Sequence, residues 1–290
     1  MKFPVLVSYA YAMKNEEHFK IIADHPDIEL LLDCGAFTAK STGREIRLDD
    51  YCSFLDRYKD KLFAYLALDV VGDPVGTEAN LQEMLKNGYK PVPVHVLGDD
   101  ERRMDELFEM SDYVACAGLR RPGKGHCPRS YVKAKMKWAK GRKVHWLGYV
   151  VEDMIARFKP YSCDSASFNS SAIWGQLHVY MGRGEWLSSV RYDHNIEKLF
   201  NHRRALAAVY QTGVTREQIK NRANWFNKNG VTSVAHHVTT DSWVRYVIDI
   251  RKRYGTRIFL AVGVGKDHST RLIDYVEKHI AKLRLDSTAV

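Results

Sequence analysis

Three short apolar runs of this chain end in an aspartate, and these are Asp33, Asp69 and Asp164. Such runs predict buried strands, and the catalytic groups of α/β proteins gather where parallel strands end. Carboxylates held close together raise one another's pKa, so that one can stay ionised while another carries a proton. This combination suits substitution at a glycosidic carbon, where one carboxylate attacks or stabilises and the other handles protons.

Two other interpretations of the three aspartates remain open. A single aspartate after a strand is often the N-cap of the following helix. A metal site is the second alternative, because His95 and His145 lie near the ends of two further apolar runs. The two histidines lack the tight spacing of typical metal ligands, which favours the acid–base interpretation.

Glycines stand at or just after three of the expected strand ends, at Gly35, Gly118 and Gly148. Without a side chain, the backbone N–H and C=O groups at these positions can approach a planar ligand closely. A simple turn glycine is the alternative interpretation at each of the three positions.

The segment from Leu119 to Lys143 has an unusually one-sided charge. It contains ten basic residues and no acidic one: Arg120, Arg121, Lys124, Arg129, Lys133, Lys135, Lys137, Lys140, Arg142 and Lys143. A charge run is commonly a solvated helix face, but the complete lack of acid directly after Gly118 favours a surface that contacts phosphates. Tyr131, Trp138 and His126 are available there to stack on bases. This segment predicts a polyanionic partner.

Apolar periodicity predicts the elements that must position these groups. Eight strands are expected, at Phe3–Ser8, Glu29–Asp33, Phe63–Asp69, Lys90–Val96, Tyr113–Gly118, Lys143–Tyr149, Pro160–Asp164 and Arg257–Gly263. Helical spacing lies between them, as for Tyr51, Phe54 and Leu55 on one face. The alternation predicts an α/β fold with a parallel sheet, and eight strands favour a closed TIM-like (β/α)₈ barrel over an open doubly wound sheet.

The stretch 165–256 interrupts this alternation, because no clear strand but several helical patterns occur in it. One of them starts at Thr215, which forms a predicted capping box with Gln218. We therefore expect a helical elaboration inserted before the last strand. No linker indicates a second domain, so that 1–290 is expected to be a single barrel domain.

Composition excludes several protein classes. The 290 residues are 45% hydrophobic and 27% charged, as in soluble globular proteins, and no apolar run is long enough to cross a membrane. The apolar stretch 1–7 is too short for a signal peptide, so a cytoplasmic location is expected. The five cysteines are odd in number and form no C-x-x-C pair, which argues against disulfides and structural zinc. The net charge of +9 agrees with a polyanionic partner.

Two motifs resemble those of a known enzyme superfamily. The residues Asp33-Cys34-Gly35-Ala36-Phe37 resemble the D-S-G-G-F/Y signature of tRNA-guanine transglycosylases. The residues Cys163-Asp164-Ser165-Ala166-Ser167-Phe168 resemble the F-D-S-A-S-Y signature around the nucleophile of archaeal members. The intervening motifs Leu68-Asp69, Pro91-Val92-Pro93-Val94-His95, Ala117-Gly118-Leu119 and Leu147-Gly148 follow in the order of that superfamily. The resemblance covers about residues 30–170.

The resemblance implies a barrel enzyme that exchanges guanine in a polynucleotide for a 7-deazaguanine through a covalent glycosyl-enzyme. Asp164 would attack C1′ and displace guanine, and Asp33 would be the acid/base that deprotonates the incoming base. The base would be bound by Asp69, His95 and the Gly118 and Gly148 backbone, and clamped between Phe37 and Leu147. The basic segment is expected to bind the nucleic acid through Arg120, Arg121, Lys124, Arg129, Lys133 and Lys135. No cofactor is implied beyond the 7-deazaguanine co-substrate.

Two departures from the tRNA enzymes indicate which branch this chain is most similar to. The C-x-C-x-x-C…His zinc site that follows the nucleophile is missing, since no cysteine occurs after Cys163. Asn169-Ser170-Ser171 stands where bacterial members have P-T-R. With no zinc subdomain, the chain looks more like the DNA-acting branch of phages and bacterial DNA-modification clusters, which implies DNA as the partner and 7-cyano-7-deazaguanine or a related base as co-substrate.

Three alternatives stay open at this point. A tRNA transglycosylase of the queuine type is the first. A catalytically silent nucleic-acid-binding barrel is the second, although such a subunit needs neither Asp33 nor Asp164. A small-molecule glycosidase is the third, and the basic segment argues against it. No membrane partner is expected, whereas a homodimer or a partner protein from a modification cluster is compatible with the sequence.

Overall fold

The computed structural model describes residues 2–121, 125–169, 175–225, 233–263, 272–274 and 276–279. Its contacts divide the chain into two compact units. The first contains the described residues of Lys2–Ser165 and Tyr254–Ser269, and the second those of Ala166–Arg253 and Thr270–Val290. All three aspartates of the predicted site belong to the first unit.

An eight-stranded parallel sheet forms the first unit, and it confirms all eight predicted strands. The strands are β1 (Phe3–Ser8), β2 (Ile28–Asp33), β3 (Ala64–Tyr65), β4 (Val94–His95), β5 (Tyr113–Cys116), β8 (Lys143–Trp146), β9 (Ser162–Ser165) and β12 (Arg257–Val262). Their order is β3-β2-β1-β12-β9-β8-β5-β4. The first and last strands of the sheet in chain order therefore pair with each other, as in a TIM-like fold and unlike a doubly wound sheet.

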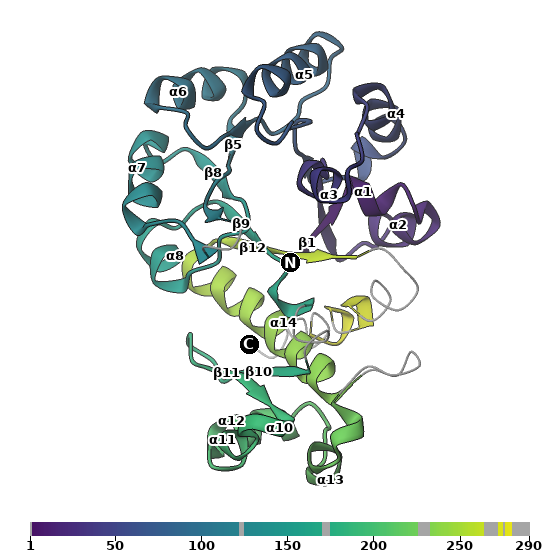
Figure 1. Cartoon of the computed structure of the whole chain (residues 1–290), viewed down its shortest axis with the longest axis vertical. Coiled ribbons are helices and arrows are strands. Elements are labelled where there is room, and N and C mark those ends of the chain that lie inside the picture. The colour runs from purple at the N-terminus through teal and green to yellow at the C-terminus, as the bar shows by residue number, and fades with distance from the viewer. Residues whose placement is uncertain are drawn as a thin grey trace, which may run out of the picture. The chain divides into compact units, whose positions relative to one another are not determined.

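The sheet is strongly curled, as Figure 1 shows. A parallel bridge joins Leu66, directly after β3, to Val92, just before β4. The Val92 N–H donates to the Tyr65 carbonyl at 2.8 Å, and the Ala67 N–H donates to the Val92 carbonyl at 2.9 Å. Side chains from β1, β2, β4, β5 and β12 pack into one common apolar cluster: Leu6, Leu31, Leu66, Val92, Val94, Tyr113, Ala115 and Phe259.

Helices lie along the outside of the curled sheet (Figure 1). They are α1 (Tyr9–Ala12), α2 (Glu16–Ala23), α3 (Ala36–Thr42), α4 (Leu48–Tyr58), α5 (Pro74–Lys86), α6 (Glu101–Met110), α7 (Arg129–Ala139) and α8 (Glu152–Phe158), with a 3₁₀ turn η1 (Lys59–Lys61). The predicted apolar face of α4 is confirmed, because Tyr51, Phe54 and Leu55 are buried. Asp73 and Asp100 cap α5 and α6 by accepting backbone N–H groups.

A small antiparallel pair precedes α7, formed by β6 (Arg120–Arg121) and β7 (Gly125–His126). This pair was not predicted, because its residues are basic or glycine and show no apolar alternation.

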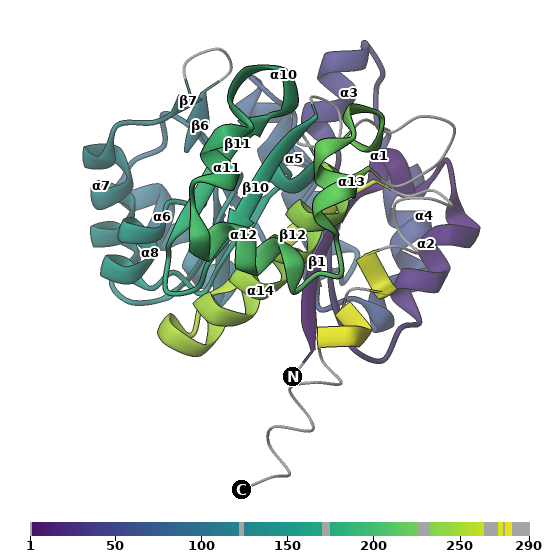
Figure 2. The same ribbon diagram turned by 90° about the horizontal axis from the view of Figure 1, so that it is seen from below.

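The second unit combines an antiparallel hairpin with helices, which Figure 2 shows from below. The hairpin pairs β10 (Gln176–Tyr180) with β11 (Trp186–Arg191). The helical elements are α10 (Tyr192–Asn195), α11 (Glu197–Phe200), α12 (Arg203–Tyr210), α13 (Arg216–Lys220), η2 (Arg222–Asn224) and α14 (Val234–Tyr254). The capping box of Thr215 and Gln218 is confirmed at the start of α13.

The expectation that no strand occurs in 165–256 is wrong. Leu177 and Val179 are fully buried on β10, but a register shift between them interrupts the ladder. On β11, Ser188 and Ser189 are exposed and only Val190 is buried, so the alternation that marks a strand is weak. The apolar core of this unit joins Leu177, Val179 and Val190 to residues of α11–α14.

Within the described residues, no helix has both the length and the apolar character that crossing a membrane requires.

Candidate functional site

The carboxyl ends of the parallel strands bring the three predicted aspartates into one neighbourhood. Asp33 is the last residue of β2, Asp164 lies on β9, and Asp69 follows β3. Burial raises the pKa of Asp33 to about 6, and the charges of Asp164 and Asp69 add to that rise. The Gly35 N–H, which donates to Asp33 Oδ2 at 3.0 Å, opposes it. A carboxyl group with a pKa of about 6 can gain or lose a proton near neutral pH, and the role of Asp33 as a proton carrier stays a prediction.

A glycine fixes the turn that follows Asp33. Gly35 has φ +85°, in the left-handed region of backbone angles. It is the N-cap of α3, which follows β2. A Cβ at this position would lie 3.0 Å from Ala10 Cβ and from Ser8 Oγ. The site thus needs a glycine both for its backbone angle and for the close approach of α1.

We expect Gly35→Ala to destabilise the chain by about 2 kcal/mol or more, since it adds crowding to left-handed strain. Gly88→Ala is the matched control, because Gly88 has φ +81° and no heavy atom lies within 4 Å of the position that an added Cβ would take. That variant should lose only about 1 kcal/mol. Urea unfolding of both variants measures the difference, and equal losses would contradict the close packing described for Gly35.

Asp164 is held through one of its two carboxylate oxygens. The Gly148 N–H donates to Oδ1 at 2.7 Å, and His145 Nε2 contacts the same oxygen at 3.2 Å. Among the described residues, no donor is within hydrogen-bonding distance of Oδ2. The Asp164 side chain is 13% exposed. Oδ1 therefore has two hydrogen-bonding contacts, whereas Oδ2 has none among the described residues.

A buried polar chain lies behind Asp164 and was not predicted. His145 Nδ1 contacts Ser162 Oγ at 2.6 Å, and Ser162 Oγ contacts the Tyr113 hydroxyl at 2.5 Å. From the sequence, His145 was considered only as a possible metal ligand near a strand end. A signal was available, because Ser162 and Asp164 are two residues apart on one strand and so share one face of the sheet.

Asp69 is supported by α5. Thr77 Oγ1 donates to Asp69 Oδ1 at 2.9 Å, and Asn80 Nδ2 donates to the Leu68 carbonyl at 3.2 Å. Burial raises the pKa of Asp69, and the bond from Thr77 opposes that rise. Asp69 therefore lies at the predicted edge of the site with one oxygen already bonded to a helix.

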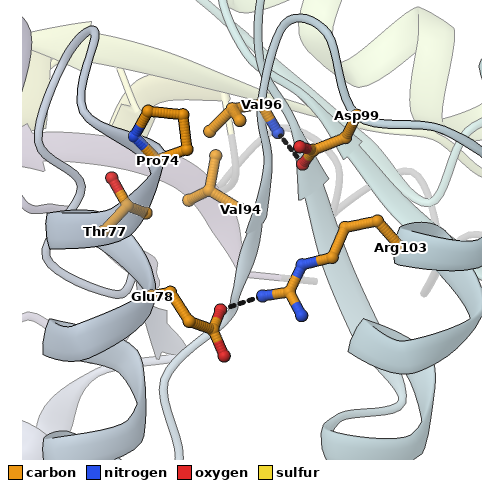
Figure 3. A pocket seen from close by; sticks show the side chains of 7 residues that line it. All are labelled: Pro74, Thr77, Glu78, Val94, Val96, Asp99 and Arg103. Carbon is orange, nitrogen blue, oxygen red and sulfur yellow. Dashed lines mark hydrogen bonds and ion pairs between the residues drawn. The ribbon is translucent and has the colours of Figure 1, made fainter.

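A pocket of about 250 Å³ lies between α5, β4 and α6, as Figure 3 shows. Its lining consists of Pro74, Thr77, Glu78, Val94, Val96, Asp99 and Arg103. Thr77 links this pocket to Asp69.

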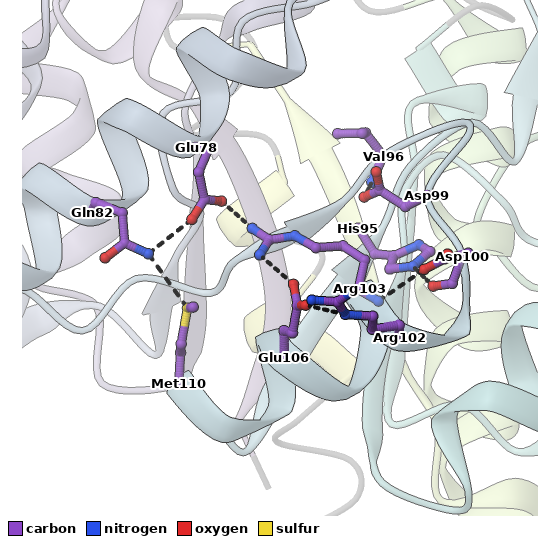
Figure 4. Close-up of polar contacts among 10 residues, drawn as sticks. All are labelled: Glu78, Gln82, His95, Val96, Asp99, Asp100, Arg102, Arg103, Glu106 and Met110. Atoms are coloured by element: carbon purple, nitrogen blue, oxygen red, sulfur yellow. Dashed lines mark hydrogen bonds and ion pairs between the residues drawn. The ribbon is translucent and has the colours of Figure 1, made fainter.

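The cation of the pocket is already neutralised. Arg103 forms ion pairs with Glu78 and, at 3.2 Å, with Glu106 (Figure 4). Asp99 Oδ2 accepts the Val96 N–H at 2.8 Å. A guanidinium shared by two carboxylates has little remaining capacity for a phosphate, so the pocket does not favour an anion.

Two of the predicted binding residues, His95 and Lys135, are buried against each other. His95 Nε2 lies 2.8 Å from the Asp100 carbonyl and therefore donates its proton there (Figure 4). Lys135 Nζ contacts His95 Nδ1 and donates to the Val96 carbonyl at 3.0 Å. Burial and the neighbouring Lys135 lower the pKa of His95 to about 4, and burial lowers that of Lys135 to about 8.

The predictions for His95 and Lys135 need correction. Both side chains are 0% exposed, and both ring nitrogens of His95 already have partners. His95 has no ring nitrogen left for the edge of a base, and Lys135 cannot reach a phosphate on the surface. The pair instead joins β4 to α7.

The remaining predicted base-binding residues differ in exposure. Phe37 is 67% exposed at the start of α3, and Leu147 is partly buried against the apolar cluster within the sheet. Gly118 has φ +75°, and a Cβ there would lie 2.9 Å from Leu97 Cβ. Gly148 contributes its N–H to Asp164. The roles of these residues toward a base stay predictions.

The basic segment is less one-sided in space than in sequence. Arg129 pairs with Asp153 at 2.6 Å, Lys140 and Arg142 with Asp105, and Lys143 with Asp112 at 2.6 Å. Arg120 and Arg121 form β6, and Lys124 lies outside the described residues. Lys133 and Lys137 are exposed on α7.

Four of the five cysteines are buried, and these are Cys34, Cys116, Cys127 and Cys163. In the part of the chain that the structure describes, no three His, Cys, Asp or Glu side chains come together as a metal ion would require.

Comparisons with known proteins add no further assignment. No protein family, no curated protein and no solved structure matches this chain. The arrangement of Asp33, Asp164 and His145 is therefore the basis for any functional conclusion.

Proposed function

We propose that this chain is a DNA-guanine transglycosylase, a glycosyltransferase that exchanges guanine in DNA for a 7-deazaguanine base. The observation that carries the proposal is the pair of unequal carboxylates, Asp164 and Asp33. Asp164 has one oxygen fixed by two N–H groups and the other unbonded among the described residues. Asp33 has its pKa raised to about 6 and is influenced by the charge of Asp164. A nucleophile and a separate proton carrier are what base exchange requires.

A closed (β/α)₈ barrel is the fold that we propose for the first unit. Around the sheet, the eight strands follow one another in chain order, with β3 and β4 at its two edges. The bridge between Leu66, just after β3, and Val92, just before β4, connects these two edges. The common cluster of side chains from non-adjacent strands also supports a filled barrel interior. On this interpretation, 165–256 is an insertion between the seventh and eighth barrel strands.

The proposed reaction has two balanced steps. Asp164 Oδ2 attacks C1′ while the C1′–N9 bond breaks, and guanine leaves with a proton from Asp33. The incoming 7-deazaguanine then loses its N9 proton to Asp33 and attacks C1′, and the C1′–Oδ2 bond breaks. Asp33 ends protonated, as it began, and Asp164 ends ionised.

A nucleic acid is the substrate class that the surroundings of the site favour. The target nucleoside must leave its base stack to reach Asp164, and the exposed ring of Phe37 lies two residues after Gly35. Lys133 and Lys137 on α7 supply exposed positive charge for phosphates. DNA is preferred to tRNA on the sequence resemblance, because the zinc module of the tRNA enzymes is missing.

Two lysines of α7 should behave differently in DNA binding. We expect Lys133→Ala to weaken binding and to lower the slope of log affinity against log salt by about 1, since one exposed phosphate contact is lost. Lys135→Met should leave the slope unchanged because Lys135 is buried. Fluorescence anisotropy with a labelled duplex over a salt series measures both slopes. An equal loss in the two variants would contradict the burial of Lys135.

Mass spectrometry of nucleosides tests the proposed function. The chain is expressed in cells that make 7-deazaguanine precursors but lack their own tRNA transglycosylase, and DNA and tRNA are purified separately. A deoxynucleoside that carries a 7-deazaguanine is the expected result. Modified tRNA alone would replace DNA by tRNA as substrate, and two unmodified pools would favour the silent nucleic-acid-binding barrel.

A further inference from the structure

We infer that His145 is a positioning residue that selects which oxygen of Asp164 reacts, and that Ser162 and Tyr113 fix the ring for this role. The inference rests on the proposed function, but its geometric part can be measured without any enzymatic activity. It is built on four side chains of three neighbouring strands, β5, β8 and β9, all within the first unit (Figure 1).

The proton positions along the chain follow from counting donors and acceptors. An ionised Asp164 only accepts, so His145 Nε2 must carry a proton and donate it to Oδ1 across 3.2 Å. In a neutral ring, Nδ1 then accepts the Ser162 hydroxyl proton across 2.6 Å. Ser162 Oγ in turn accepts the Tyr113 hydroxyl proton across 2.5 Å. In this direction, each hydroxyl and ring nitrogen of the series from Tyr113 to Asp164 has a hydrogen-bonding partner.

The ring is also confined by its neighbours. His145 is 0% exposed, and Tyr113 and Phe259 contact it edge to face at centroid distances of 6.4 and 6.0 Å. Phe259 lies on β12 in register with Asp164. These two aromatic contacts and the bond to Ser162 restrict the ring, so that its Nε2 is directed at Asp164.

Two donors on one oxygen make the two oxygens of Asp164 chemically different. Oδ1 is bonded to His145 and to the Gly148 N–H, whereas Oδ2 has no donor among the described residues. In the proposed reaction, Oδ2 becomes the ester oxygen bound to C1′, and Oδ1 becomes the ester carbonyl. When the C1′–Oδ2 bond breaks, negative charge returns to the carboxylate, and the two N–H groups stabilise it. His145 therefore orients Oδ2 for the first step and stabilises the returning charge in the second, without touching the base.

Two substitutions at His145 separate its two nitrogens. The Gln amide nitrogen can occupy the position of Nε2, so that His145→Gln keeps a donor to Asp164. The Asn amide is shorter and reaches the position of Nδ1, so that His145→Asn keeps a contact with Ser162 but loses the donor. We expect His145→Asn to lower kcat about 10- to 100-fold with little change in KM, and His145→Gln to lower it less than about tenfold.

The experiment combines these kinetics with NMR of imidazole nitrogens in ¹⁵N-histidine-labelled protein, in which His145→Gln identifies the His145 signals. The expected result is a neutral ring protonated on Nε2 in the wild type, and a weaker preference in Ser162→Ala. A proton on Nδ1 in the wild type would overturn the inference, as would equal kcat in the Asn and Gln variants. A wild type that exchanges no base would refute the proposed function, while the NMR result would still decide the orientation of His145.

Discussion

Asp164→Asn should abolish base exchange while leaving the fold and nucleic-acid binding in place. An amide nitrogen cannot form the ester to C1′, and an amide oxygen is a far weaker nucleophile than a carboxylate. The expected loss is at least about a thousandfold in kcat, as is usual when a nucleophile is removed. The amide retains an acceptor for the Gly148 N–H, so the melting temperature should change little. Release of labelled guanine from DNA measures the exchange.

Asp73→Asn is a matched control for this variant. Asp73 lies at the N-cap of α5 in the same unit and accepts the Gly76 N–H at 2.9 Å. Asparagine is an equally good N-cap, so this change of charge should leave both stability and exchange unaltered. If Asp164→Asn retains exchange within about tenfold of the wild type, Asp164 is not the nucleophile.

Asp33→Asn should make the chain more stable and much less active. Burial raises the pKa of Asp33 from 3.8 to about 6, so the folded chain releases this proton later than the unfolded chain does. Between about pH 4 and pH 6 the folded state binds more protons, and its stability therefore falls as pH rises through this window. Removing the charge should recover about 1–3 kcal/mol above pH 6 and nothing below about pH 4. Urea unfolding at pH 3.5 and pH 7.5 compares the two limits.

The catalytic effect of the same variant is a block in the second step. Without a base at this position, the incoming 7-deazaguanine keeps its N9 proton, and exchange should fall by at least about 100-fold. Solvent can still protonate departing guanine slowly, so a covalent DNA adduct should accumulate and appear on a denaturing gel. Asp164→Asn should give no adduct. Exchange at the wild-type rate in Asp33→Asn would exclude Asp33 as the proton carrier.

Much of the sheet could be predicted because its strands are buried on both faces and contain long apolar runs. All six residues of β1 are buried, and the run 3–8 had the predicted limits. The β3 and β4 ladders are only two residues long, although apolar runs of seven residues predicted them. Apolar runs indicate which residues are buried. The length of a hydrogen-bonded ladder also depends on how far the curled sheet separates neighbouring strands.

The charged residues of the candidate site could be predicted from the sequence, but the hydrogen bonds between them could not. Asp33 and Asp164 lie at strand ends, which a sequence can reveal, but the bond from His145 to Asp164 joins two strands through their register. Lys135 was predicted to bind nucleic acid because the basic segment was considered without regard to which residues share one face of a helix. Val132, Lys135 and Ala139 lie three and four residues apart and share the buried face of α7.

The position of β12 has a consequence for how the chain is synthesised. β12 pairs with β1 on one side and with β9 on the other, yet it is the last strand of the sheet to leave the ribosome. Until residue 262 has emerged, the nascent chain has two parallel strands with unpaired edges, separated by about 150 residues of sequence. Such edges invite intermolecular pairing, and contacts of this sequence separation form slowly. The sheet can therefore be completed only after residues 165–256 have been synthesised, and the edges of β1 and β9 stay unpaired until then.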